Sequence, residues 1–136
     1  MTGERTASCG CGNIRVSTTG EPLQGYACSC LDCQREPGSV FSYAAVFPRV
    51  QVSIAGTRSF WRRRGDSGRW IETEFCPACG STVLCRMESW PDVIAVSAGC
   101  FADPGFDPPD TLYWAARRHD WLSLPRETEC IDRQPD

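Results

Sequence analysis

Three groups of cysteines carry the strongest chemical signal in this sequence. The chain has 136 residues and ten cysteines, seven of which fall in the segments CGCG, CSCLDC and FCPACGS. In FCPACGS two cysteines are separated by two residues and followed by glycine, a spacing that can present both sulfurs to one metal ion. Buried apolar cysteines do not cluster at such spacings. The pattern therefore indicates metal binding.

The first and last groups together supply four sulfurs. Cys9 and Cys11 are separated by one residue, and in an extended chain such residues point to the same side. Cys76 and Cys79 form the two-residue spacing described above. Soft thiolates favour zinc over magnesium or calcium. We therefore expect a closed structural zinc site that joins the start of the chain to a distant hairpin.

The middle group, Cys28, Cys30 and Cys33, offers only three sulfurs. Three protein ligands and one open position are typical of a catalytic zinc site, so these three residues are the predicted catalytic centre. In the alternative interpretation the site is closed by a fourth ligand from elsewhere in the chain. The candidates for that ligand are Cys85, Cys100 and His119.

The basic residues of the chain are all arginines, and the formal net charge is −3. An acidic balance argues against a nucleic-acid binder that acts by neutralising phosphates. Five arginines lie close together at positions 58, 62, 63, 64 and 69. They form either a solvated strand face or a site that grips ligand carboxylates, to which the guanidinium group is well suited.

The length and composition predict one domain over residues 1–136, with its core at about 8–124 and a polar, frayed tail from Pro125 onward. No long apolar run predicts a membrane span, and MTGERTAS lacks the apolar segment of a secretory signal. We therefore expect a cytoplasmic protein, in which cysteines stay reduced.

Alternation of apolar and polar residues at period two predicts a mainly β protein, built as a compact antiparallel sheet. One short helical turn is expected at Leu31–Glu36, and the segment FADPGFDPPD at 101–110 is expected to be an ordered loop. The predicted strands are Asn13–Thr18, Leu23–Cys28, Val40–Phe47, Val50–Ile54, Arg58–Arg64, Arg69–Phe75, Ser81–Met87, Val93–Ala98 and Thr111–Ala116.

Five segments resemble, in order and spacing, the glutathione-dependent formaldehyde-activating enzyme family, which includes centromere protein V. They are CGCGNIRV, CSCLDCQREPGSVFS, FCPACGS, VIAVSAGCFADP and TLYWAARRHDWLSL, and they span about residues 8 to 124. The resemblance implies a β-tent fold. It also implies a structural zinc at Cys9, Cys11, Cys76 and Cys79 and a second, more labile zinc at Cys28, Cys30 and Cys33. Where this family often has His, between the first two cysteines of the middle group, the chain has Ser29.

The same resemblance implies a zinc-dependent carbon–sulfur lyase that adds a thiol such as glutathione to a small aldehyde such as formaldehyde. The product with formaldehyde is S-hydroxymethylglutathione. Glutathione would be the co-substrate, and its thiolate would take the open position at the second zinc. The candidates to hold its carboxylates are Arg35, Arg62, Arg63 and Arg64.

Two other functions fit the same residues. The first is a non-catalytic zinc module that binds a protein partner, as the relationship to centromere protein V suggests. The second is methionine sulfoxide reduction, which related folds perform and which needs a reactive thiol outside the metal sites. Cys100 or Cys130 would have to supply that thiol.

Overall fold

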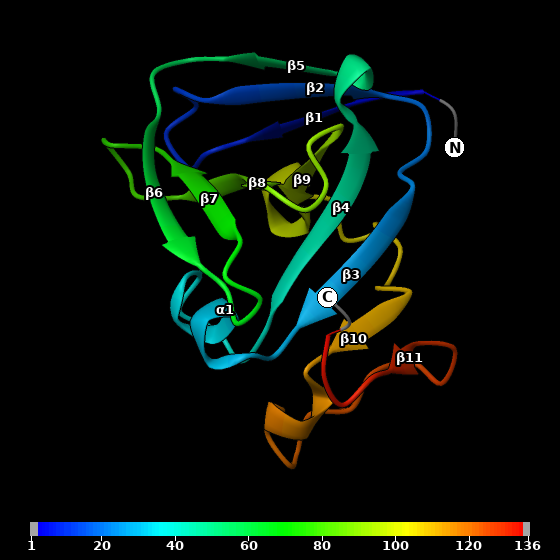
Figure 1. The fold of residues 1–136 in the computed structure, drawn as a ribbon. Coiled ribbons are helices and arrows are strands. Elements are labelled where there is room, and N and C mark those ends of the chain that lie inside the picture. Colours follow the sequence, from blue (N-terminus) through cyan, green and yellow to red (C-terminus); the bar gives the residue numbers. More distant parts are fainter. Residues whose placement is uncertain (1–2, 135–136) are drawn as a thin grey trace.

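The computed structural model describes residues 3–134, which fold into two β-sheets (Figure 1). A three-stranded sheet has the order β1-β2-β5, and an eight-stranded sheet has the order β11-β10-β3-β4-β9-β8-β7-β6. The strands are β1 (Glu4–Ser8), β2 (Arg15–Thr19), β3 (Gln24–Cys28), β4 (Ser42–Pro48), β5 (Val52–Ala55), β6 (Ser59–Arg64), β7 (Trp70–Phe75), β8 (Thr82–Met87), β9 (Val93–Ser97), β10 (Thr111–Tyr113) and β11 (Glu129–Cys130). The helical segments are α1 (Leu31–Arg35) and the 3-10 turns η1 (Arg49–Gln51), η2 (Ala98–Phe101) and η3 (Ala115–Arg117).

The main core lies between the two sheets. Val16 from the small sheet packs with Phe47 and Val96 from the large one, and all three are fully buried. Phe47 also contacts the ring of Phe101 at the end of η2. Burial of each large side chain here contributes about 2 kcal/mol. This packing fixes one face of the large sheet, so the other face is available for a site.

That other face carries a second apolar cluster. Val46, Val93 and Ala95 are buried there, and Tyr26 and Cys85 pack against them. Successive residues of a strand point to opposite faces, so β4 directs Phe47 to the main core and Val46 to this second cluster. The second cluster forms the floor of the cavity described below.

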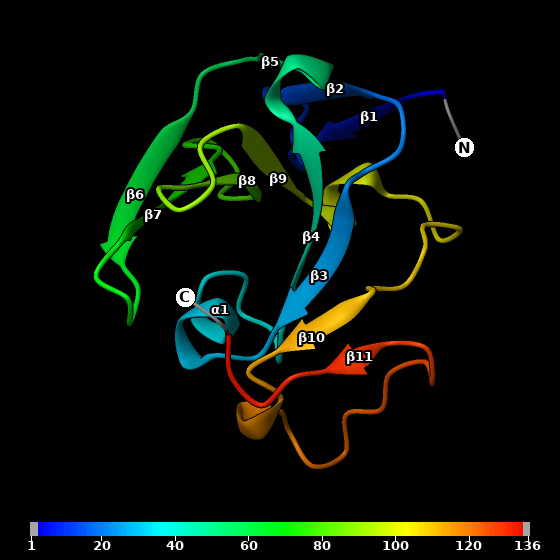
Figure 2. The ribbon, with the colours of Figure 1, turned by 45° about the vertical axis from the view of Figure 1, so that its right-hand side comes forward.

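The prediction of a mainly β protein is confirmed, but the pairings of β10 are parallel. Thr111 lies opposite Tyr26 of β3 and opposite Glu129 of β11, and both pairs run parallel. The proline-rich loop predicted at 101–110 carries the chain across so that β10 enters beside β3 in the same direction (Figure 2). Asp110 secures this arrival, because its carboxylate accepts a 2.9 Å hydrogen bond from Gly25 N–H.

Two strands were not predicted from the sequence. In β1 only Ala7 is fully buried, so the segment shows no apolar alternation. Beyond Pro125 the expectation of a frayed tail is wrong for residues 125–134, because β11 pairs with β10. Thr128 is buried just before β11, and its hydroxyl donates to the carbonyl of Pro109 at 2.8 Å. Pairing with β10 therefore holds the tail in place.

Within residues 3–134, no helix is long and apolar enough to cross a lipid bilayer.

Candidate metal centres

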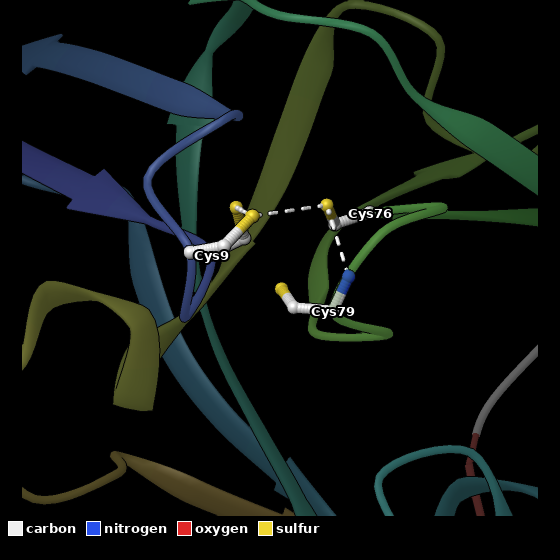
Figure 3. A group of neighbouring side chains, drawn as sticks. Cys9, Cys76 and Cys79 are labelled. Atoms are coloured by element: carbon white, nitrogen blue, oxygen red, sulfur yellow. Dashed lines mark hydrogen bonds between the residues drawn. The ribbon is translucent and has the colours of Figure 1, made fainter.

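The first group of sulfurs joins the two sheets. Cys9 and Cys11 lie in the β1–β2 loop, and Cys76 and Cys79 lie in the turn between β7 and β8. Their four sulfur atoms all lie within 4.8 Å of one another, with 3.7 Å between Cys9 and Cys11 and 3.6 Å between Cys11 and Cys76. Figure 3 shows the labelled side chains facing one another across the gap between loop and turn. A tetrahedral Zn–S₄ site needs sulfurs about 3.8 Å apart, so the spacing fits zinc.

Backbone amides support these sulfurs. Ile14 N–H donates to Cys9 Sγ at 3.2 Å, and Cys79 N–H donates to Cys76 Sγ at 3.5 Å. The Ser81 side chain, together with its backbone amide, lowers the pKa of Cys79 to about 5. Hydrogen bonds of this kind favour the charged thiolate. The local structure therefore favours the thiolate form of Cys76 and Cys79, whereas the neighbouring sulfurs of Cys76 and Cys9 raise the pKa of Cys11 to about 11.

The second group lies where β3 meets α1. Cys28 is the last residue of β3, Cys30 caps the N-terminus of α1, and Cys33 lies inside it. Their three sulfurs lie within 4.8 Å of one another. The side-chain hydrogen bonds of Cys28 and Cys33 lower the pKa of Cys30 to about 2, whereas the hydrogen bond to Cys30 raises the pKa of Cys28 to about 12. The three sulfurs thus share protons that a cation would displace.

Among the described residues, the proposed fourth ligands do not join this group. Cys100 packs against the main core and donates to the carbonyl of Thr82. Cys85 lies further along the cavity wall, where burial raises its pKa to about 12. The ring of His119 contacts Trp121, on an exposed loop. Three sulfurs from one short segment could together hold a thiophilic cation such as zinc.

The three-cysteine group opens into a cavity of about 800 Å³ on the face of the large sheet opposite the main core. The floor includes Ala44, Ala95 and Met87, which belong to or pack against the second apolar cluster. Tyr26 lines the same cavity, and its hydroxyl lies 4.0 Å from the sulfur of Met87. An apolar hollow with a few polar groups is typical of a site for a small organic ligand.

The arginines predicted to hold ligand carboxylates divide between two faces. Arg35 and Arg63 line the cavity. Arg62 instead pairs with Glu72 at 3.1 Å and lies over the ring of Trp70, while Arg64 donates to the carbonyl of Gly68. The structure therefore brings two of the four predicted arginines to the cavity.

Two further arginines, Arg69 and Arg117, also line the cavity. From the sequence, Arg69 was grouped among the five neighbouring arginines at 58–69, and Arg117 had no predicted role. Gln34 of α1 donates hydrogen bonds to the carbonyls of Ser29 and Arg117, at 2.7 and 3.1 Å. This contact joins residues 83 positions apart and places Arg117 beside the three-cysteine group. No local sequence pattern indicates that placement.

The fold and the two sulfur groups together define a small β protein with two groups of cysteines, each of which could hold a metal ion. The family profile described as "Glutathione-dependent formaldehyde-activating enzyme" matches residues 4–118. The chain therefore belongs to the glutathione-dependent formaldehyde-activating enzyme family.

Two curated relatives carry that enzyme name provisionally. The protein from Fusarium vanettenii is 27% identical over 86 residues, covering 63% of this chain and 46% of the relative. The protein from Emericella nidulans is also 27% identical over 86 residues, covering 63% of this chain and 43% of the relative. The matched stretch is therefore less than half the length of either relative. A crystal structure of a Rhodobacter sphaeroides protein has the same fold, with a TM-score of 0.56 and 20% identity over 76% of this chain and 91% of that one.

Proposed function

We propose that this protein catalyses the addition of a thiol such as glutathione to a small aldehyde such as formaldehyde, and the reverse carbon–sulfur cleavage. The carrying observation is the convergence of three sulfurs, from Cys28, Cys30 and Cys33, at the wall of one ligand-sized cavity. Family membership supports the same reaction class. In the forward reaction a carbon–sulfur bond forms at the carbonyl carbon, and the thiol proton ends on the carbonyl oxygen.

The three-cysteine group would hold a zinc ion, which when bound supplies Lewis-acid activation of an incoming thiol. The four-cysteine group would hold a second, structural zinc. The chain's own residues would orient the substrate. Arg35 has a side chain that is 77% exposed and only a 3.9 Å contact to Asp32, so its guanidinium can turn toward a ligand carboxylate. Arg69 and Arg117 line the same cavity and are our further candidates for this contact.

The hydroxyl of Tyr26 is the candidate donor to the substrate oxygen. Its ring is packed edge-on against Tyr113, which holds it against the floor. Burial raises the pKa of Tyr26 well above its usual value, so the hydroxyl keeps its proton at neutral pH and can donate a hydrogen bond. We place this activity in the cytoplasm, where thiol substrates stay reduced.

The test compares the wild-type protein with Cys30→Ser, each loaded with zinc and mixed with glutathione and formaldehyde. Proton NMR exchange spectroscopy measures the rates at which S-hydroxymethylglutathione forms and breaks down, and these rates are compared with those measured without protein. The wild type is expected to accelerate both directions, and the variant is expected to lose the acceleration. Equal rates with and without the wild-type protein would contradict the proposal and favour a non-catalytic zinc module.

A second measurement separates thiol binding from turnover. Cobalt(II) substituted for zinc gives sulfur-to-metal absorption bands that change when a further sulfur binds. Addition of glutathione is expected to change the bands assigned to the three-cysteine group. Unchanged bands at saturating glutathione would show a closed site and contradict the role proposed for it.

A further inference from the structure

Arg63 belongs to β6, and its side chain extends from the β6–β7 hairpin to α1 and is only 10% exposed. Each of its three nitrogens has a partner. Nε lies 3.0 Å from Glu36 Oε1, Nη1 lies 3.5 Å from Asp32 Oδ2, and Nη2 lies 3.9 Å from the sulfur of Cys33. The guanidinium thus joins the hairpin to α1 and to one sulfur of the three-cysteine group.

We propose that Arg63 is a positioning residue of the three-cysteine group, which fixes α1 and the sulfur of Cys33 in the geometry that a bound metal needs. The inference rests on the proposed function in one respect, that this group takes a thiophilic metal. It gives Arg63 a different task from the grip on ligand carboxylates that its sequence position suggested.

The need for such a support follows from the helix itself. α1 has five residues, none of them buried, so neither its length nor its packing can hold Cys33 in place. Gln34 ties one side of α1 to the carbonyls of Ser29 and Arg117. Arg63 ties the helix to the hairpin through Asp32 and Glu36, which lie one turn apart. Together these contacts hold the helix from two directions.

The charges around Arg63 support the same role. Two carboxylates and a sulfur already occupy the planar fork of donors. A ligand carboxylate would have to displace one of them, whereas the exposed Arg35 is available without that cost.

The neighbouring residue provides a matched control. Arg62 follows the same strand but points to the opposite face, where it pairs with Glu72 and lies over Trp70. Arg62→Gln and Arg63→Gln therefore remove the same charge from adjacent positions of β6. Only the second removes a contact with α1. Arg63→Lys keeps the charge but lacks the fork that reaches three partners at once.

The experiment measures zinc affinity by chelator competition at both sites of the wild type and the three variants, with circular dichroism to follow folding. Outer contacts that orient metal ligands are commonly worth tenfold to hundredfold in metal affinity. Arg63→Gln is expected to weaken the second zinc by about tenfold or more, with the first zinc and the folded spectrum unchanged. Arg63→Lys is expected to recover only part of the loss, and Arg62→Gln to match the wild type.

Equal second-site affinity in Arg63→Gln and the wild type would overturn the proposal, as would an equal loss in Arg62→Gln. If Arg63→Gln does not fold, Glu36→Gln tests the same contact from the helix side and is expected to weaken the second zinc in the same direction. Unchanged affinity in that variant would also overturn the proposal. These results are independent of turnover, because a wild type that binds two zinc ions but lacks activity would contradict the proposed function and leave the role of Arg63 standing.

Discussion

The two sulfur groups are expected to contribute unequally to stability, and the comparison of Cys9→Ser with Cys30→Ser tests this. Cys9 is 3% exposed and belongs to the group that joins segments 65 residues apart along the chain, as measured from Cys11 to Cys76. Cys30 belongs to the group in which all three ligands fall within one short stretch of sequence, 28–33. Loss of a metal from the first group therefore frees a long loop, and loss from the second frees a short one.

The magnitude follows from the entropy of closing each loop. A cross-link over 65 residues stabilises the folded state by about 4 kcal/mol, and one over five residues by about 2 kcal/mol. A chain of this length loses about 4 °C in melting temperature for each kcal/mol. Cys9→Ser is therefore expected to lower the melting temperature by about 16 °C and Cys30→Ser by about 8 °C at most.

The assay is thermal unfolding of zinc-loaded protein followed by circular dichroism, with metal content measured on the same samples. Cys130→Ser is the control, because Cys130 is exposed and belongs to neither group. Cys130→Ser is expected to have the same melting temperature as the wild type. Equal losses in Cys9→Ser and Cys30→Ser, or a larger loss in Cys30→Ser, would refute the assignment of the structural role to the four-cysteine group.

Two further substitutions test features outside the sulfur groups. Glu74→Gln is expected to cost about 3 kcal/mol at neutral pH, because the buried carboxylate pairs with Arg58 at 2.8 Å and Arg86 at 2.6 Å. Burial acts to raise the pKa of Glu74, but these arginines hold it below its usual value of 4.5. The difference in free energy of unfolding between wild type and variant, measured in urea, should therefore shrink as the pH falls below 4.5. A difference that does not change with pH would contradict this account. Gly56→Ala is expected to cost about 3 kcal/mol or more, because φ is +104° and the new Cβ would lie 2.0 Å from the carbonyl oxygen of Asn13. Asn13 also contacts the sulfur of Cys76 at 3.6 Å, so a displaced Asn13 is expected to weaken zinc binding at the four-cysteine group. If Gly56→Ala has the melting temperature and the four-cysteine zinc affinity of the wild type, this turn does not support the metal site.

The grouping of the seven clustered cysteines could be predicted because its signal is local. Spacings of one or two residues determine which sulfurs can face one ion, and simple counting then assigned four to one group and three to the other. The structure brings the same residues together. The strands of the large sheet were also predictable where apolar residues alternate, as in Val93–Ser97.

The placement of Arg62 and Arg63 on opposite sides of β6 was not predicted, because it depends on which side of the strand faces the cavity. Arg62, Arg63 and Arg64 were treated as a unit, although adjacent residues of a strand point to opposite sides. Which side faces the cavity is set by pairing with β7, where Arg63 lies opposite Ile71. The sequence of β6 alone does not contain that information.

Two predicted strand boundaries are wrong for a similar reason, because contacts outside the strand set them. Val50 begins the alternation that predicted a strand at 50–54, yet it lies in the turn η1 and is 95% exposed. The strand predicted at 111–116 ends after Tyr113, because Trp114 adopts a left-handed conformation with φ +55°. The parallel pairing of β10 depends on a contact between Gly25 and Asp110, 85 residues apart. Long-range contacts of this kind leave no local pattern.

The β7–β8 hairpin has two chemically distinct sides. Thr73 and Met87 line the cavity, whereas Glu74 and Arg86 form ion pairs on the reverse of the same two strands. Residues that line the cavity and residues that form ion pairs therefore lie next to one another along both strands. Under the proposed function, substitutions of Thr73 or Met87 would change the shape of the cavity, while the ion pair between Glu74 and Arg86 would still hold the two strands of the hairpin together.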